Sequence, residues 1–214
     1  MKIAIIGATG WIGSTLVAEA QSRGHDVIAI ARDSSKIAAT GVDKRSLDLS
    51  AADNSTAITA AVTGADLVIA SIGGRAAGNH EIVAASAQRL LNELPAAGVN
   101  RLLWVGGAGS LEVAPGVTLL SLPEFPEAYK GEATAQGEAL AVFRNSDSAV
   151  NWTFISPAAE IFPGERSGHY RTGGDSLVSD SEGKSRISVQ DYAVAMIDEA
   201  EKNAHPKQRM GVAY

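Results

Sequence analysis

The chain has 214 residues, of which 45% are hydrophobic and 20% charged, a composition that excludes disordered and fibrous proteins and favours one globular domain. A formal net charge of −6 argues against nucleic-acid binding, which depends on a basic surface. The absence of cysteine excludes disulfides, thiolate catalysis and Cys-based zinc sites. No run approaches the ~20 apolar residues that span a bilayer, and the apolar run before Gly7 is too short for a signal peptide. We therefore expect a cytoplasmic protein with no membrane partner.

Five short apolar runs are each nearly continuous, which is typical of strands buried on both faces of a parallel sheet. They are Ile3–Ile6, Val27–Ile30, Leu67–Ala70, Leu102–Val105 and Trp152–Ile155, with Asp43–Ser46 as a weaker candidate. Helical segments alternate with them, at Ile12–Arg23, Asn54–Val62, Asn79–Ala97 and about Glu127–Arg144. This alternation predicts an α/β fold, a Rossmann-like doubly wound parallel sheet with helices on both faces.

The pattern changes after Pro157. Residues 157–188 are rich in Gly, Ser, Pro and charge, and we expect them to form a small irregular C-terminal cap on the substrate side. Short strands are expected near Ser176–Val178 and Ser185–Ser188. A capping box beginning at Ser188 predicts a last helix to about Lys202. Residues 1–214 are thus predicted to be a single domain.

A glycine-rich loop connects the first strand directly to the first helix. In such a loop one glycine allows a tight turn, one lets the backbone approach a pyrophosphate, and one lets the helix pack on the strand. The helix N-terminus then offers unpaired N–H groups to the phosphates. The predicted cofactor-binding residues of this loop are Gly7, Thr9, Gly10, Trp11, Ile12 and Gly13.

The motif Gly-Ala-Thr-Gly-x-x-Gly resembles that of the short-chain dehydrogenase/reductase superfamily, in its extended and atypical branches. Further stretches resemble the bacterial proteins proposed to be NADH-flavin reductases, which are similar to the biliverdin-IXβ/flavin reductases and to NmrA-like NADP-binding proteins. These stretches are Gly106–Ser110, Tyr129–Ala133, Trp152–Pro157 and Pro163–Arg166. The resemblance covers nearly the whole chain and implies an oxidoreductase with a nicotinamide cofactor.

The end of the second strand bears on the choice of cofactor. An acidic residue there would bind the ribose 2′-hydroxyl of NAD, whereas an arginine can bind the 2′-phosphate of NADP. Arg32 occupies this position and predicts NADP, while the adjacent Asp33 leaves NAD possible. The resemblance implies that Asp48 and Leu49 flank the adenine, although Asp48 would equally suit a turn.

Small residues follow the next two long strands, where the backbone can approach the ribose and pyrophosphate. The resulting cofactor candidates are Ser71, Ile72, Gly73 and Gly107. The resemblance implies that Pro157 shapes the nicotinamide pocket. Ser110 is a candidate substrate contact, although a loop serine beside glycines is more often structural.

Typical short-chain dehydrogenases use a Tyr-x-x-x-Lys pair as acid and base. No tyrosine here has a lysine four residues later; Lys130 resembles the family lysine, but Pro126 stands where the tyrosine belongs. Hydride can pass directly from a nicotinamide to a flavin, a quinone or a similar flat aromatic acceptor without a protein acid. We therefore predict an NAD(P)H-dependent reductase in which Lys130 holds the nicotinamide ribose, flavin is a substrate, and Ser110 and Tyr129 complete the catalytic candidates.

Other functions remain open. One is a non-catalytic NADP(H) redox sensor of the NmrA-like type, and another is an epimerase- or dehydratase-like enzyme on sugar nucleotides, which the missing tyrosine disfavours. The four histidines are scattered, so no metal is expected. We expect a monomer or a homodimer. Candidate acceptor contacts in and near the cap are Phe125, Phe162, Arg166, His169, Tyr170 and Arg171.

Overall fold

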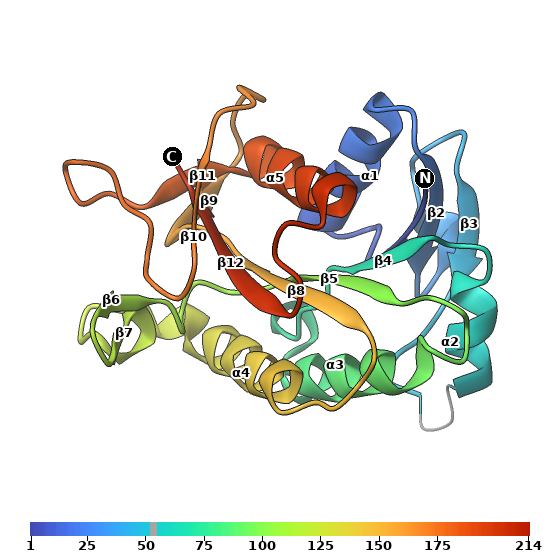
Figure 1. Cartoon of the computed structure of the whole chain (residues 1–214), viewed down its shortest axis with the longest axis horizontal. Coiled ribbons are helices and arrows are strands. Elements are labelled where there is room, and N and C mark those ends of the chain that lie inside the picture. The colour runs from blue at the N-terminus through green and yellow to red at the C-terminus, as the bar shows by residue number, and fades with distance from the viewer. Residues whose placement is uncertain (52–54) are drawn as a thin grey trace.

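The computed structural model describes residues 1–51 and 55–214. Within them, an eight-stranded sheet has the order β10-β12-β8-β5-β4-β1-β2-β3 (Figure 1). Its strands are β1 (Lys2–Ile6), β2 (Asp26–Ala31), β3 (Asp43–Ser46), β4 (Leu67–Ala70), β5 (Arg101–Val105), β8 (Asn151–Ser156), β10 (Arg171–Gly173) and β12 (Gln208–Ala213). All neighbours pair in parallel except β10 and β12. The predicted mostly parallel sheet is confirmed.

The two faces of the sheet are covered by the helices α1 (Trp11–Ser22), α2 (Ser55–Val62), α3 (Glu81–Glu93), α4 (Glu127–Arg144) and α5 (Val189–Lys202). Figure 1 shows α1 and α5 on one side of the sheet and α2, α3 and α4 on the other. Short 3-10 turns occur at Ser34–Lys36, Arg75–Ala77 and Leu119–Ser121. Among the residues described, no helix combines the length and apolar character needed to cross a membrane.

Two hydrophobic cores explain why the strands read as continuous apolar runs. Along β1, Ile3 and Ile5 enter the core beneath α1 and α5, whereas Ala4 and Ile6 enter the core on the side of α2, α3 and α4. Successive side chains of a strand point to opposite faces, so every position must be apolar when both faces are covered. The strand order reverses between β1 and β4, which directs the site to the carboxyl ends of these strands.

Two sequence-based expectations need correction, and a third falls at the gap in the described residues. The helix expected to reach Ala97 ends at Glu93, because Pro95 cannot continue it. The expected strand at Ser176–Val178 reduces to an isolated bridge between Ser176 and Glu112. The helix expected to begin at Asn54 is described from Ser55 onward, and Asn54 lies outside the described residues.

The predicted irregular cap follows β8. Its strands β9 (Glu160–Phe162) and β11 (Arg186–Ser188) pair in parallel, and the second confirms the expected strand at Ser185–Ser188. The predicted cap on α5 is also present, since Ser188 Oγ accepts a hydrogen bond from the Asp191 N–H at 3.0 Å. A separate hairpin, β6 (Glu112–Ala114) and β7 (Val117–Thr118), lies opposite the cap at the left of Figure 1. The Glu112 N–H donates to the Asp175 carbonyl at 2.8 Å, so hairpin and cap are joined.

Candidate functional site

Two glycines of the first loop are required by the protein itself. Gly7 has φ +85°, and a Cβ added to it would lie 2.1 Å from the Ser71 carbonyl oxygen. A Cβ on Gly13 would lie 2.0 Å from the Gly7 carbonyl oxygen. Both contacts involve backbone atoms, which cannot swing away as a flexible side chain could. These glycines therefore bring β1, the loop and α1 into contact at the end of β4.

Gly10 serves a different purpose. Its φ of −74° and ψ of 164° suit any residue, and the nearest atom to an added Cβ is the Gly7 carbonyl oxygen at 3.3 Å. It is exposed at the start of α1, and no side chain caps the helix. The first N–H to bond back into the helix is that of Ser14, which donates to the Gly10 carbonyl at 2.8 Å. Because Gly10 has no side chain, the space in front of the unpaired N–H groups at the start of α1 stays open, and a pyrophosphate can fit there.

The remaining residues of the loop divide between surface and core. Thr9 and Trp11 are exposed, and 47% of the Trp11 surface is accessible. Ile12 is partly buried and packs against the core beneath α1 and α5. Trp11 and Thr9 thus form the rim of the predicted phosphate site, while Ile12 anchors the helix.

At the end of β2, Asp33 and Arg32 are placed differently. Asp33 Oδ1 accepts hydrogen bonds from the Ser35 N–H at 3.1 Å and the Ser35 hydroxyl at 2.6 Å, and these bonds lower the pKa of Asp33. Lys36 adds an ion pair at 3.7 Å. Arg32 is exposed and makes no ion pair with any residue of the described ranges. The local turn thus occupies the carboxylate and leaves the guanidinium accessible.

Asp48 lies at the end of the neighbouring strand. Its carboxylate accepts hydrogen bonds from the Ser50 N–H at 2.9 Å and hydroxyl at 2.6 Å, which is the turn role considered for it. These bonds, and to a smaller degree the charge of Arg32, lower the pKa of Asp48. Leu49 is buried, and Arg89 of α3 donates to its carbonyl at 2.8 Å. The structure thus brings Arg32 and Asp48 to the same edge of the sheet.

The loop after β4 is held by a carboxylate that sequence reasoning did not place there. Glu132 of α4 accepts hydrogen bonds from the N–H groups of Gly74 and Arg75, both at 3.0 Å. The ring of His80 lies 3.2 Å from the same oxygen. A Cβ added to Gly73 would lie 3.1 Å from Glu132, so Gly73 leaves room for this carboxylate.

Gln136, one turn further along α4, extends this connection. Its amide donates to the Ile72 carbonyl at 3.0 Å and to Glu132 at 3.3 Å, while its oxygen accepts from the buried Trp104 indole at 3.0 Å. A Cβ on Gly107 would lie 3.0 Å from the Gln136 Cβ. The loops after β4 and β5 therefore both pack on one helix face. The four-residue spacing of Glu132 and Gln136 was the available sequence signal, but their partners are distant in the chain.

The start of α4 carries Pro126 and the two catalytic candidates Tyr129 and Lys130. Pro126 is the N-cap residue of this helix and offers no hydroxyl. Tyr129 is 48% exposed, and the Arg75 guanidinium lies 4.5 Å from the centre of its ring. Lys130 forms an ion pair with Glu127 at 2.7 Å.

Ser110, in the loop after β5, lies beside a different part of α4. Arg209 donates to its carbonyl at 3.0 Å and to its hydroxyl at 3.2 Å. A Cβ on Gly137 would lie 3.9 Å from the Ser110 Cβ, and Gly137 is about 10 Å along the helix from Lys130. Among the residues that the structure describes, no hydrogen bond or ion pair joins Ser110, Tyr129 and Lys130, and their catalytic roles remain predictions.

Several polar candidates in the cap are engaged by the fold. Arg166 makes two 2.8 Å hydrogen bonds to the buried Glu19 of α1. Tyr170 donates to Asp198 of α5 at 2.7 Å, and Arg171 donates to the Ser179 carbonyl at 2.8 Å. These contacts attach the cap to the fold.

The remaining candidates lie at the edges of the cap. Pro157 is buried directly after β8, where it can form a wall of the predicted nicotinamide pocket. Phe162 packs against Tyr214 with ring centres 6.4 Å apart. His169 is exposed and Phe125 is partly buried. No three His, Cys, Asp or Glu side chains in the described part of the chain are grouped to hold a metal.

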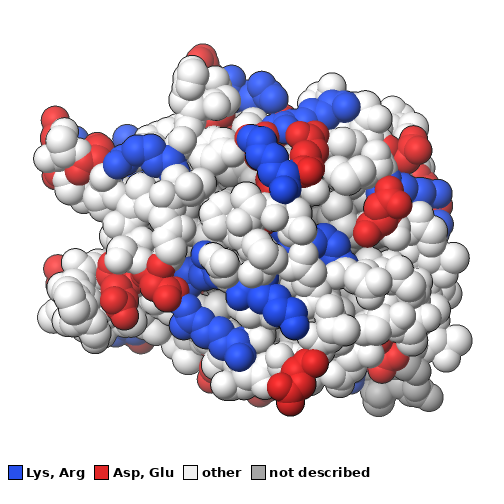
Figure 2. Space-filling model, viewed as in Figure 1, with Lys and Arg blue, Asp and Glu red and all other residues white. Residues whose placement is uncertain are grey.

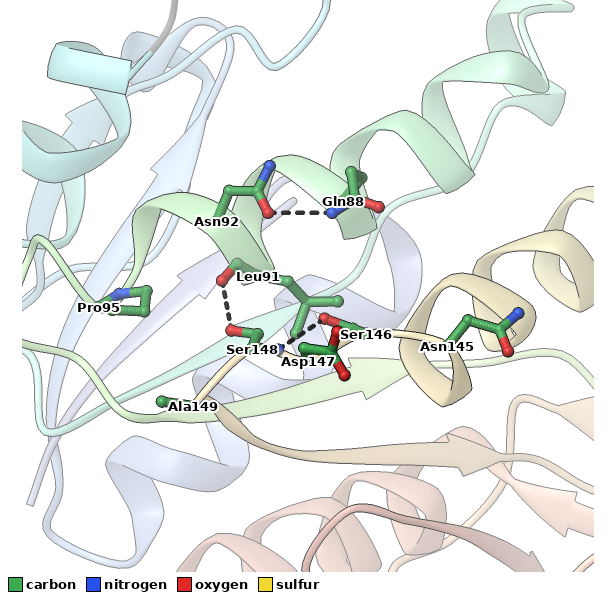
Figure 3. A pocket seen from close by; sticks show the side chains of 9 residues that line it. All are labelled: Gln88, Leu91, Asn92, Pro95, Asn145, Ser146, Asp147, Ser148 and Ala149. Atoms are coloured by element: carbon green, nitrogen blue, oxygen red, sulfur yellow. Dashed lines mark hydrogen bonds between the residues drawn. The ribbon is translucent and has the colours of Figure 1, made fainter.

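A cavity of about 450 Å³ lies at the opposite edge of the sheet, between the ends of α3 and α4 (Figure 3). Its polar side chains largely satisfy one another: Gln88 donates to Asn92 at 3.0 Å, and Ser148 donates to the Leu91 carbonyl at 2.6 Å. It is far along the sheet from the glycine loop and offers no basic group to a dinucleotide. This cavity therefore has no feature suited to the pyrophosphate of a dinucleotide.

Several solved structures are similar to this chain in sequence and in fold. A proposed exported protein of Burkholderia pseudomallei is 42% identical, with a TM-score of 0.90 and full coverage of both chains. A proposed NADH-flavin reductase of Streptococcus pneumoniae is 36% identical, with a TM-score of 0.87 over 100% of this chain and 99% of that one. A proposed epimerase of Bacteroides thetaiotaomicron is 38% identical, with a TM-score of 0.87 over 100% and 96%.

The names of these relatives differ in activity, and one describes an exported protein, so the cytoplasmic location remains a prediction. A family model described as NAD(P)H-binding matches residues 7–200, from the first glycine of the loop to the end of the last helix. This range includes the exposed start of α1 at Gly10 and the loops held by α4. The chain belongs to the NAD(P)H-binding family, an atypical branch of the short-chain dehydrogenase/reductase type.

Proposed function

We propose that this protein is an NADP(H)-preferring reductase that delivers hydride to a flat acceptor such as a flavin or a quinone. The observation that carries the proposal is the combination of an open phosphate cradle at Gly10 with a proline at the position of the family tyrosine. The protein has what is needed to hold a dinucleotide but lacks the usual phenol.

The cofactor would be held at three places. The N–H groups at the start of α1 would bind the pyrophosphate, with Gly10 leaving room for it. Arg32 would bind the 2′-phosphate, because its guanidinium is accessible and Asp33 is occupied by its own turn. Lys130 would bind the nicotinamide ribose in exchange for its surface contact with Glu127.

The nicotinamide supplies the hydride when bound, and the protein supplies position. Glu132 and Gln136 fix the loop after β4, and Gln136 also packs against Gly107. The exposed ring of Tyr129, stacked under Arg75, offers a flat surface at the rim where an aromatic acceptor can lie. A flavin or quinone can take its proton from water, so no side chain need donate one.

The relatives support this function to different degrees. The Streptococcus pneumoniae protein is named for NADH-flavin reductase activity, whereas the Bacteroides thetaiotaomicron protein is named for epimerase activity. An epimerase of the usual kind would require an acid and base near the nicotinamide, and Pro126 supplies neither. The missing phenol therefore favours the reductase.

The test is to follow NADPH and NADH absorbance at 340 nm with purified protein and either FMN or a quinone. Acceptor-dependent NADPH oxidation, faster than NADH oxidation and absent in Gly10→Val, is the expected result. Tight NADPH binding with no turnover on any flavin, quinone or carbonyl would replace the reductase with a redox sensor. Turnover of a sugar nucleotide instead would favour the epimerase.

A further inference from the structure

A second cavity, of about 330 Å³, opens beside the start of β12. It lies between the end of α4, the start of β12 and the turn at Gly174–Asp175 of the cap. Figure 2 shows basic side chains gathered between α4 and β12 on this face of an otherwise acidic protein. The volume is within the range that small ligands occupy.

Three cations line this cavity against one carboxylate. Arg144, Lys207 and Arg209 carry the positive charges, and Asp175 contacts the two arginines at 2.5 Å and 3.1 Å. Glu112 is a further carboxylate that acts on Arg209. The lining itself keeps a net charge of +2, which matches a dianion.

Arg209 is unlike a solvated surface arginine. Its side chain is 3% exposed, and burial lowers its pKa. Two of its nitrogens bind Ser110, while Nε, which lies 3.1 Å from Asp175, has no aligned hydrogen-bond acceptor. A buried charge with an unmet donor is costly unless a further anion compensates it.

Two further features of the lining concern Trp152 and the backbone of Lys207. Trp152 is 5% exposed, and its indole N–H has no hydrogen-bond partner among the described residues. Lys207 has φ +53°, an unusual backbone conformation for a lysine, and such outliers concentrate at binding sites. Its ammonium donates to the Ser148 carbonyl at 2.9 Å, so the lysine stands beside the cavity with one of its three donors engaged.

We propose that this cavity binds a phosphate group, either free or carried by a small metabolite. Arginine forks bind phosphate oxygens in pairs, and the indole N–H provides a neutral donor. Asp175 occupies the arginines until the phosphate displaces it. This site is separate from the nucleotide site. The last residue of α4, Arg144, lines the cavity, whereas the first turns of α4 contact the loop after β4.

Inorganic phosphate is the probe, and the three tryptophans are the reporters. In a 15N-labelled protein at constant ionic strength, the indole signal of Trp152 should shift saturably with a Kd on the order of 1 mM. Trp104, which is buried on Gln136, should not move, and Trp11 reports separately on phosphate at the glycine loop. A shift of Trp11 alone, or an equal Trp152 shift with chloride, would overturn the proposal.

Two variants give opposite results. Arg144→Gln should weaken phosphate binding about tenfold, whereas Asp175→Asn should strengthen it, because a competing carboxylate is removed. Lys184→Gln, a surface cation paired with Glu182 outside the cavity, should change nothing. Weaker binding in Asp175→Asn would contradict the proposal. Tighter binding of glycerol 3-phosphate than of phosphate would identify a metabolite as the source, and equal binding would identify free phosphate.

Discussion

The glycine-loop end and the cap use their polar groups in opposite ways. Around Gly10 and Arg32 the fold leaves helix N–H groups and a guanidinium available to a ligand. In the cap, Arg166 and Tyr170 bind carboxylates of α1 and α5. The first region is prepared for a charged ligand, whereas the polar groups of the second mostly hold the cap in place. A charged residue near a site can therefore be assigned to that site only when its hydrogen-bond and ion-pair partners are known.

The largest expected effect comes from closing the phosphate cradle. Gly10→Val should abolish NADPH binding, a loss of at least a hundredfold or about 2.7 kcal/mol, because the side chain would fill the space before the helix N-terminus. Its backbone conformation accepts valine, so the variant should stay folded. Calorimetric titration with NADPH, alongside circular dichroism, measures both. A folded variant that still binds NADPH would place the nucleotide elsewhere.

Gly13→Ala provides the contrast within the same loop. Its Cβ would meet the Gly7 carbonyl, so it should lower the free energy of unfolding by at least about 2 kcal/mol. Urea denaturation checks this value. A Gly13→Ala protein as stable as the wild type would remove the distinction drawn between the two glycines.

Arg32→Glu should weaken NADPH binding by about 1.5–3 kcal/mol and leave NADH binding nearly unchanged. The reason is the loss of a charge-assisted contact to the 2′-phosphate. Kd values for both cofactors are the measurement, and Lys184→Glu makes the same charge change at a remote surface position. Equal losses for the two cofactors would mean that Arg32 supports the fold.

The cap side of the comparison can be tested through pH. Burial alone would raise the pKa of Asp198, but hydrogen bonds from Lys202, Tyr170 and Arg23 hold it at about 2, below its ordinary 3.8. A lowered pKa stabilises the fold above the unfolded value, so this contribution is present at neutral pH and is lost as pH falls from about 4 to 2. Asp198→Asn should cost about 1–2 kcal/mol at pH 7, with partial exposure taken into account.

Denaturant titrations of Asp198→Asn at several pH values give the check. The difference from wild type should shrink toward pH 2, where the carboxylate is protonated in both states. A constant difference would show that the carboxylate charge is not what attaches α5 to its neighbours.

The smallest effect is expected at Tyr129. If hydride passes directly to the acceptor, Tyr129→Phe should change the rate less than about tenfold, or 1.4 kcal/mol. The ring that stacks with Arg75 is kept in this variant. Lys130→Ala should raise KM for NADPH and lower kcat moderately. A loss of about a hundredfold in Tyr129→Phe, with cofactor binding intact, would restore a phenolic acid to the mechanism.

The central sheet was predictable because its signal is local. Continuous apolar runs such as Ile3–Ile6 identify strands buried on both faces, and glycines such as Gly24 end the helices between them. The strand β12, which lies between β10 and β8, was not predicted, because it begins with Gln208 and Arg209. Arg209 is buried there because Ser110, 99 residues away, accepts its hydrogen bonds and Asp175 pairs with its charge.

The site was predictable to the same extent. Gly10 lies in the short loop after β1, and Arg32 directly follows β2. Their positions in the chain therefore locate them at the carboxyl edge of the sheet. Glu132 showed only a family likeness in the sequence, since its role depends on a loop 57 residues earlier folding back to it. The engaged state of Arg166 depends likewise on Glu19, 147 residues away.

The backbone contacts of Gly7 and Gly13 also determine which positions a cofactor-switching library can usefully vary. An added side chain at either position meets a carbonyl oxygen, and no truncation of a neighbouring residue can remove a carbonyl. No second-site mutation can therefore compensate for a side chain added at either position. Such a library should vary the exposed residues Thr9, Trp11 and Arg32, where a new side chain would contact the ligand without colliding with the protein.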